Sequence, residues 1–225
     1  MKRICLLIGE GDSERYFFPK ILERKSFKSL SLKEGSLSIF NKEDVYWFFP
    51  FPPNLGVRMS GKGRLKKSTT YTLAHSYIQT NTHIFSGDNY EIHLIAMFDT
   101  ETEEANISTT KDDINRAITT SGRGFSSVTI LPIAVQIESW YFAGLESTFP
   151  YFLNKNDPDL CRLLSTKTSN RHNKVNFEKH IDLDRMIGAK DIAQSVAEHF
   201  NEEKALQYSD SFKEFSSLVI GKNLF

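Results

Sequence analysis

The stretch RICLLIGEGDSE, residues 3–14, decides the fold because it joins a buried strand to a helix and places a carboxylate at the junction. Its apolar run, Ile4 to Ile8, is short and partly β-branched, which is typical of a parallel strand covered on both faces. We expect Gly11, with the glycine before Glu10, to form a tight turn, and Ser13 to cap the helix that follows. Glu10 then projects from the carboxyl edge of the sheet, where open α/β folds bind ligands.

A second apolar run, residues 92–98, is interrupted only by one histidine and ends in Asp99, Thr100 and Glu101. Alternate residues of an extended segment share a face, so we expect Asp99 and Glu101 to point the same way. If this strand and the first one are neighbours in the sheet, Glu10 lies beside Asp99 and Glu101. Three ionised carboxylates this close repel one another strongly unless a divalent cation neutralises them. The sequence therefore suggests a Mg²⁺ or Mn²⁺ site.

Three short motifs in this order resemble a known family: EGDSE at residues 10–14, IESWY at 137–141 and SDSF at 209–212. A strand that ends in Glu-Gly, with a later strand that ends in Asp-x-Glu, resembles the Toprim domain of topoisomerases, primases and overcoming-lysogenization-defect nucleases. More narrowly, the chain resembles a Toprim-like bacterial family of unknown function over nearly its whole length. It departs from the common Toprim pattern at one position, where Glu101 stands in place of Asp.

The resemblance implies roles for four acids. Glu10 is a general acid/base or a metal ligand, Asp99 and Glu101 hold metal, and Glu138, in the Glu-x-Trp element, faces the site. Other interpretations of the same residues stay open. Glu138 is also explained as an acid favoured at a helix N-terminus by the helix dipole, and the strand-end acids are also explained as solvated turn residues.

A basic stretch, RMSGKGRLKK at residues 58–67, holds five cations and two glycines in ten residues. Glycines let backbone amides approach phosphates and the cations neutralise them, but the spacing is not that of a Walker A loop. The stretch is either a nucleic-acid-binding surface or a solvated basic loop. The candidate phosphate contacts are Arg58, Lys62, Arg64, Lys66 and Lys67.

Composition indicates one structural unit. The chain has 225 residues, of which 40% are hydrophobic and 12% aromatic, so it can bury a sizeable core. Alternating strands and helices favour an α/β fold, which the resemblance specifies as a Toprim-like (Rossmann-like) central, mostly parallel sheet flanked by helices. We expect a core at residues 1–145 with an insertion at about 27–70, and a helical C-terminal extension at 146–225 that packs on the core.

Local patterns predict the remaining elements. Residues 30–32 and 37–39 are expected to pair as a hairpin inside the insertion. The aromatic segment at residues 47–53 is too proline-rich for a central strand, so we expect a packed loop there. A third core strand is expected at 128–135. Helices are expected at residues 71–79, 111–118 and 190–200, and Phe212 and Phe215 are expected in the core.

Charge and cysteine content restrict the class of protein. The 28 basic and 28 acidic residues balance, so the net charge does not indicate a general polyanion binder, and any nucleic-acid affinity must be local. The two cysteines, Cys5 and Cys161, cannot form a disulfide framework or a zinc quartet. No apolar run is long enough to span a bilayer. We therefore expect a cytoplasmic protein without a membrane segment.

These observations lead to a functional expectation. The carboxylates indicate a Mg²⁺ or Mn²⁺ site, and the resemblance implies a nuclease that uses this metal to cleave nucleic acid, with DNA favoured over RNA, in bacterial anti-phage defence. The alternative is a catalytically silent Toprim-like binding subunit. The chain has no Gly-x-x-x-x-Gly-Lys-Ser/Thr motif, whereas the resembled nucleases act with an ATPase. A separate ATPase partner that docks through residues 47–51 is therefore expected, and an oligomer is compatible with the sequence.

Overall fold

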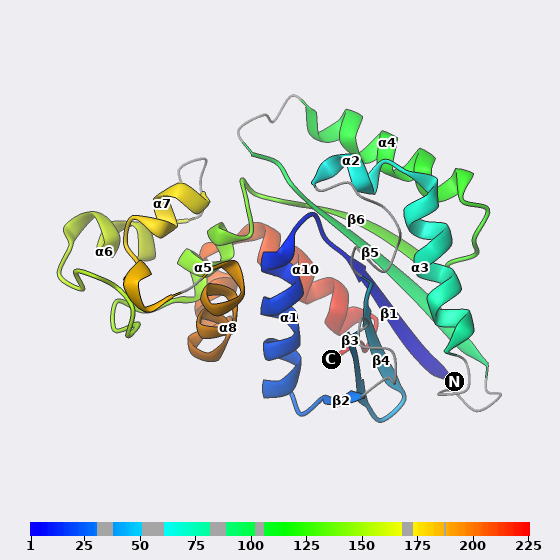
Figure 1. Ribbon diagram of the computed structural model, residues 1–225, viewed down its shortest axis with the longest axis horizontal. Helices are drawn as coiled ribbons and strands as arrows, with labels where there is room; N and C mark the ends of the chain where they lie inside the picture. Colours follow the sequence, from blue (N-terminus) through cyan, green and yellow to red (C-terminus); the bar gives the residue numbers. More distant parts are fainter. Residues whose placement is uncertain (31–37, 51–60, 82–88, 102–105, 168–172, 187) are drawn as a thin grey trace.

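The protein is an α/β structure built on one six-stranded, mostly parallel sheet with helices on both faces (Figure 1). The computed structural model describes residues 1–30, 38–50, 61–81, 89–101, 106–167, 173–186 and 188–225. The expected α/β class, with a mostly parallel sheet flanked by helices, is confirmed.

The sheet has the strand order β2-β3-β4-β1-β5-β6. The last four strands of this order, β4, β1, β5 and β6, run parallel to one another. β3 is antiparallel to both of its neighbours, β4 and β2. At the centre, Cys5 pairs with Trp47 on one side and with His93 on the other. The strands are β1 (Lys2–Ile8), β2 (Lys28–Leu30), β3 (Ser38–Lys42), β4 (Val45–Phe49), β5 (Tyr90–Asp99) and β6 (Ser127–Ile133).

Alternating side chains of each strand divide the core into two hydrophobic layers. In β1, Cys5 and Leu7 face one layer, while Ile4, Leu6 and Ile8 face the other. The first layer is closed by α1 (Asp12–Arg24), α5 (Glu138–Gly144), α8 (Ala189–His199), α9 (Glu202–Tyr208) and α10 (Asp210–Gly221). The second is closed by α2 (Lys62–Leu65), α3 (Ser68–Thr80) and α4 (Ile107–Thr120).

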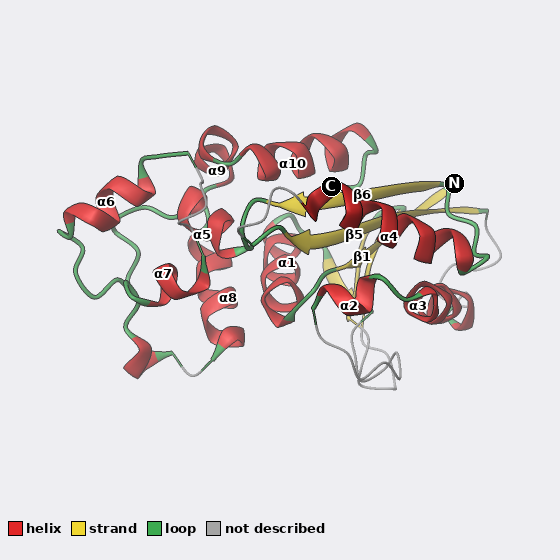
Figure 2. Cartoon of the chain, turned by 90° about the horizontal axis from the view of Figure 1, so that it is seen from above, coloured by secondary structure: helices red, strands yellow, loops and turns green. Residues whose placement is uncertain are grey.

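The part of the chain after residue 145 is helical in the described ranges. Short helices, α6 (Pro158–Leu164) and α7 (Lys174–Glu178), lie beyond the end of the sheet, as Figure 2 shows, and a 3₁₀ turn follows at Leu183–Arg185. α8 then packs on α1, and α10 lies against β6. The chain end is anchored because the Trp47 indole N–H donates to the Leu224 carbonyl at 2.7 Å.

Several local predictions hold. Helices cover the three ranges expected for them, except that α8 ends at His199, one residue early, and Phe212 and Phe215 are buried in the first layer. The third core strand is β6. The hairpin expected from residues 30–32 and 37–39 lies largely outside the described residues, and the antiparallel pair seen there joins Lys28–Leu30 to residues 39–41. The longest helix of the described chain is only 14 residues, and none in that part is long and apolar enough to cross a membrane.

Two local predictions are wrong. The aromatic segment is not a loop: residues 45–49 form β4, a fully buried strand beside β1, because the strand ends before the prolines begin. Trp47 and Phe49 are therefore unavailable as a docking surface for a partner, and residues 51–60 lie outside the described part of the chain. The N-cap of α1 is Gly11 rather than Ser13.

Candidate functional site

The carboxyl ends of β1 and β5 form the topological switch point of the sheet. After β1 the chain enters α1, which packs in the first layer, and after β5 it enters α4, which packs in the second. The two connections therefore diverge at this edge, which is where open α/β sheets bind ligands. Glu10 follows β1, and Asp99 is the last residue of the neighbouring strand.

Glu10 is held by the backbone of two other segments. Its Oε1 accepts a hydrogen bond from the Asp99 backbone N–H at 3.0 Å, and its carbonyl accepts one from the Gly61 N–H at 3.3 Å. Burial raises the pKa of Glu10 to about 7, against the lowering effect of the Asp99 hydrogen bond and of Lys62. A carboxyl with this pKa can exchange a proton near neutral pH.

Glu14 lies in the first turn of α1 and is buried, with 2% of its surface exposed. Its Oε2 accepts from the Gly11 N–H at 3.3 Å, while its Oε1 has no hydrogen-bond partner among the described residues. Burial raises the pKa of Glu14. Gly9 makes room for this carboxylate, because a Cβ atom at Gly9 would lie 3.0 Å from the Glu14 Cδ.

Gly11 contributes less than the sequence suggested. Its φ of −137° is ordinary extended backbone that any residue adopts. A Cβ atom there would make only a normal contact, 3.5 Å from the Glu14 Oε2. Of the two glycines in the turn, Gly9 is therefore the one that the site requires.

Asp99 and Glu138 complete the set of acids with raised pKa values. Burial raises the pKa of Asp99 well above its usual range, and the charges of Glu14, Glu10 and Glu138 raise it further. Its Oδ1 is buried without a hydrogen-bond partner among the described residues. Glu138 begins α5, is 6% exposed, and has a pKa raised to about 7 by burial. The sequence predicted that Glu138 faces the site. Its charge raises the pKa of Asp99, so it lies near the other acids.

We name these four residues, Glu10, Glu14, Asp99 and Glu138, the carboxylate centre. They come from the ends of β1 and β5 and from the first turns of α1 and α5, so three strand-to-helix connections contribute to it. The charges of Glu10, Glu14 and Glu138 each raise the pKa of Asp99, and Glu14 also raises the pKa values of Glu10 and Glu138. Like charges in a buried site resist full ionisation, so the centre favours either bound protons or a bound cation.

Two cations of α2 lie beside the carboxylate centre. Lys62 lowers the pKa of Glu10 and of Asp99, and its Nζ is 3.5 Å from the Glu101 Oε2. Arg64 is buried, donates a hydrogen bond from Nη2 to the Gly9 carbonyl, and lowers the pKa of Glu14. Gly61, just before α2, has a φ of +69°, a left-handed conformation that favours glycine. α2 is therefore attached to the β1–α1 turn at two points.

A second group of residues borders the centre on the side of α7 and α8. The buried Tyr141 hydroxyl lies near Ser13, and burial together with Glu138 raises the pKa of Tyr141. Lys174 lowers the pKa of Glu138. A cavity of about 10 Å³, just large enough for one water molecule, is lined by Glu138 and Lys174 on this side of the centre. Its lining residues are Ser13, Glu138, Lys174, Phe177, Glu178, Ala189 and Ile192.

Glu101 does not share a face with Asp99, contrary to the sequence expectation. β5 ends at Asp99, and Glu101 adopts a left-handed φ of +55°. Its backbone N–H donates to the Val135 carbonyl at 2.8 Å, so the loop is fixed by the chain beyond β6 rather than by strand geometry. Its side chain is exposed and pairs with Lys62. Glu101 therefore lies at the margin of the site, close enough only to raise the pKa of Glu10 slightly.

The five cations of the basic stretch do not form one surface. Arg58 lies outside the described residues. Lys62 and Arg64 face the carboxylate centre, and Arg64 is too buried to be a surface phosphate contact. Lys66 is exposed and pairs with Asp113 at 3.0 Å, and Lys67 is exposed at the start of α3.

The carboxylates of the centre have the chemistry that a hard divalent cation needs, but their side chains do not form a ready set of ligands among the described residues. Carboxylate oxygens are the ligands that Mg²⁺ and Mn²⁺ prefer, and two buried ones, Glu14 Oε1 and Asp99 Oδ1, lack hydrogen-bond partners in the described chain. However, no three His, Cys, Asp or Glu side chains within the described ranges already converge on one point as metal ligands. Side-chain rotation within the centre is needed for a complete ligand set.

Sequence reasoning missed Glu14 and assigned Arg64 to a surface that binds phosphates. The only sequence signal for Glu14 was its spacing, four residues after Glu10. This spacing places Glu14 in the first turn of α1, close to the end of β1. Arg64 was grouped with its basic neighbours, and its burial depends on a carbonyl 55 residues earlier. Comparison with family models gives no match for this chain, and comparison with curated proteins gives none either.

Proposed function

We propose that this protein is a Toprim-like, Mg²⁺- or Mn²⁺-dependent nuclease whose active site is the carboxylate centre. The observation that carries the proposal is the position of four buried or half-buried carboxylates with raised pKa values at the switch point of a mostly parallel sheet. Buried carboxylates that lack full hydrogen bonding reduce the stability of a fold. A perturbed acid cluster at a ligand-binding edge is therefore better explained by function than by structure.

The buried oxygens without hydrogen-bond partners indicate which groups would hold the cation. We assign Glu14 Oε1 and Asp99 Oδ1 to it, with Glu138 completing the ligand set. A bound divalent cation supplies Lewis-acid polarisation of a phosphoryl oxygen. Glu101, exposed and paired with Lys62, is assigned only a minor role at the margin.

The residues of the chain supply the other functions. Glu10, with a pKa of about 7, is the proposed proton-exchanging group, which a phosphodiester hydrolase needs near neutral pH. Lys62 lies beside it and would stabilise negative charge on the phosphate. Arg64 is a positioning residue, since its guanidinium holds the Gly9 carbonyl just before Glu10.

The biological setting belongs to the same proposal. Through the resemblance of the three sequence motifs, we propose a cytoplasmic effector of anti-phage defence that acts on nucleic acid, with DNA favoured, and works with a separate ATPase. The burial of residues 47–49 removes the segment first suggested for docking. The partner surface is therefore not assigned to β4.

A catalytically silent subunit is the second candidate. It is favoured by one observation: Lys62 and Arg64 already lower the pKa values of three of the four acids, while no ready set of three metal ligands is present among the described residues. In that case the centre would be neutralised from within the chain. Such a protein would bind nucleic acid or a partner without cleaving.

A cleavage assay separates the two candidates. Supercoiled plasmid, single-stranded DNA and RNA are each incubated with the protein and Mn²⁺ or Mg²⁺, with and without chelator. The proposal expects metal-dependent cleavage that falls at least about 100-fold in Asp99→Asn. Asp159→Asn, at an exposed ion-paired acid of α6, is the matched control. Equal cleavage by Asp99→Asn and the wild type, or cleavage that persists in chelator, would refute the nuclease proposal.

A further inference from the structure

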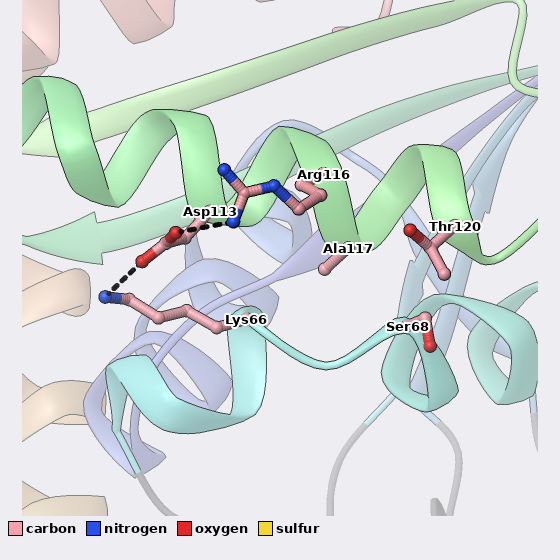
Figure 3. Close-up of a pocket in the computed structure, with 6 residues that line it drawn as sticks. All are labelled: Lys66, Ser68, Asp113, Arg116, Ala117 and Thr120. Carbon is pink, nitrogen blue, oxygen red and sulfur yellow. Dashed lines mark hydrogen bonds and ion pairs between the residues drawn. The ribbon is translucent and has the colours of Figure 1, made fainter.

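A surface cavity of about 360 Å³ lies between α2, α3 and α4, outside the carboxylate centre (Figure 3). Two cations, Lys66 and Arg116, and two hydroxyl side chains line it, and Ala117 is a buried apolar residue among them. The lining residues are Lys66, Ser68, Asp113, Arg116, Ala117 and Thr120. With one acid and two cations, the lining has a net charge of +1.

Both cations are held at the cavity by the same carboxylate. Lys66 Nζ is 3.0 Å from Asp113 Oδ2, and Arg116 Nη1 is 3.5 Å from Asp113 Oδ1, as the dashed lines of Figure 3 show. The side chain of Arg116 is 76% exposed, so its remaining N–H donors can reach a ligand. Asp113 thus holds two cationic side chains together and would compete with any bound anion for them.

The cavity is connected to the carboxylate centre through α2. The Lys66 N–H donates to the Lys62 carbonyl at 3.3 Å, which places Lys62 and Lys66 one helical turn apart on the same face. Lys62 acts on Glu10 and Asp99, whereas Lys66 lines the cavity. One turn is about 5.4 Å, or roughly one to two steps along a nucleic-acid strand.

We propose that this cavity binds a backbone phosphate of the nucleic acid, one or two nucleotides from the phosphate at the carboxylate centre. The inference rests on the proposed nuclease function, because its ligand is that enzyme's substrate. The lining contains charges and hydroxyls but no aromatic side chain on which a base could stack. Contacts of this kind fix the register of a strand without reading its sequence.

The test is a binding experiment in chelator, so that it does not depend on cleavage. A fluorescein-labelled single-stranded DNA oligonucleotide is titrated with full-length protein at several salt concentrations, and fluorescence anisotropy gives the affinity. Lys66→Ala and Arg116→Ala should each weaken binding by roughly tenfold at low salt and reduce the salt slope by about 0.7 to 1. Asp113→Asn should strengthen binding, since it removes the competing carboxylate.

Arg162→Ala is the matched control, because Arg162 is also an exposed arginine paired with an Asp three residues earlier. It should bind as the wild type does, and thermal melts should show that all four variants are folded. The proposal is overturned if the Lys66 and Arg116 variants behave like Arg162→Ala, if Asp113→Asn binds more weakly, or if the wild type does not bind in chelator. Cleavage lost in Asp99→Asn while these binding results fail would leave the nuclease proposal intact.

Discussion

Two regions of this molecule differ in how their buried polar atoms are hydrogen-bonded. In the aromatic core, formed by Phe18, Trp47, Trp140 and Phe215, both indole N–H groups have partners: Trp47 donates to Leu224 and Trp140 to the Ser211 Oγ at 2.8 Å. In the carboxylate centre, Glu14 Oε1 and Asp99 Oδ1 lack such partners among the described residues. One region is built for stability, and the other retains an unfavourable arrangement.

The difference teaches where stability and function are separated in this fold. Both regions meet on α5, where Glu138 joins the carboxylate centre and Trp140, two residues later, packs against Phe18 and Phe215. The rigid aromatic packing fixes the helix that carries Glu138. Substitutions in the two regions should therefore change stability in opposite directions.

The largest effect is expected in the aromatic core. Trp140→Ala removes a fully buried ring that contacts Phe18, Phe212 and Phe215, and should lower the free energy of unfolding by about 3–5 kcal/mol. For a chain of this size, that corresponds to a fall in Tm of roughly 10 °C. Calorimetry measures it. Trp140→Phe should cost clearly less, and equal losses in both variants would show that ring volume does not decide the effect.

Asp99→Asn should have the opposite sign. It removes a buried charge that three neighbouring carboxylates oppose, while the backbone N–H that holds Glu10 remains. We expect the metal-free protein to gain about 1–2 kcal/mol at about pH 8. Chemical denaturation in chelator gives the value. A lower stability than the wild type would mean that Asp99 is a structural residue.

The pH dependence of stability tests the same contrast. Burial raises the pKa of Glu138 from its ordinary value of 4.5 to about 7, so between these pH values the folded protein binds more protons than the unfolded chain. Stability is then favoured below about pH 4.5 and is lost as pH rises through 7. Glu138→Gln should match the wild type near pH 5 and exceed it by on the order of 2 kcal/mol at pH 8. A constant difference across this range would contradict the shifted pKa.

The smallest effect is expected at the glycine that accommodates Glu14. In Gly9→Ala the new Cβ would lie 3.0 Å from the Glu14 Cδ and 3.1 Å from its Oε1, so the buried carboxylate must shift. We expect a loss of about 1 kcal/mol. Gly124→Ala is the matched control, because a Cβ there meets nothing within 4 Å. Equal melting temperatures for the two variants would show that the Gly9 contact is tolerated.

The sequence predicted the fold best where a local pattern settles the structure. Continuous apolar runs identified β1 and β5, and helical spacing identified α3 and α4. β4 was missed because Pro50 and its neighbours suggested a loop, although the strand ends at Phe49, before the first proline. Local composition shows that prolines are present but does not show on which side of them a strand stops.

The site was predicted in outline and missed in detail for a different reason. Glu10 and Asp99 follow from strand ends, which a sequence marks clearly. The position of Glu101 depends on a hydrogen bond to the Val135 carbonyl, and the burial of Arg64 depends on the Gly9 carbonyl. These are contacts between distant segments, so neither residue spacing nor composition reports them.

The central claim is that the carboxylate centre binds a divalent cation, and Mn²⁺ titration calorimetry tests it most directly. Metal-free wild type, Asp99→Asn and Asp159→Asn are titrated at about pH 8, where the centre is most ionised. We expect the wild type and Asp159→Asn to bind Mn²⁺ alike and Asp99→Asn to lose that binding. Equal Mn²⁺ binding by Asp99→Asn and the wild type, or no binding by any of the three, would contradict the claim.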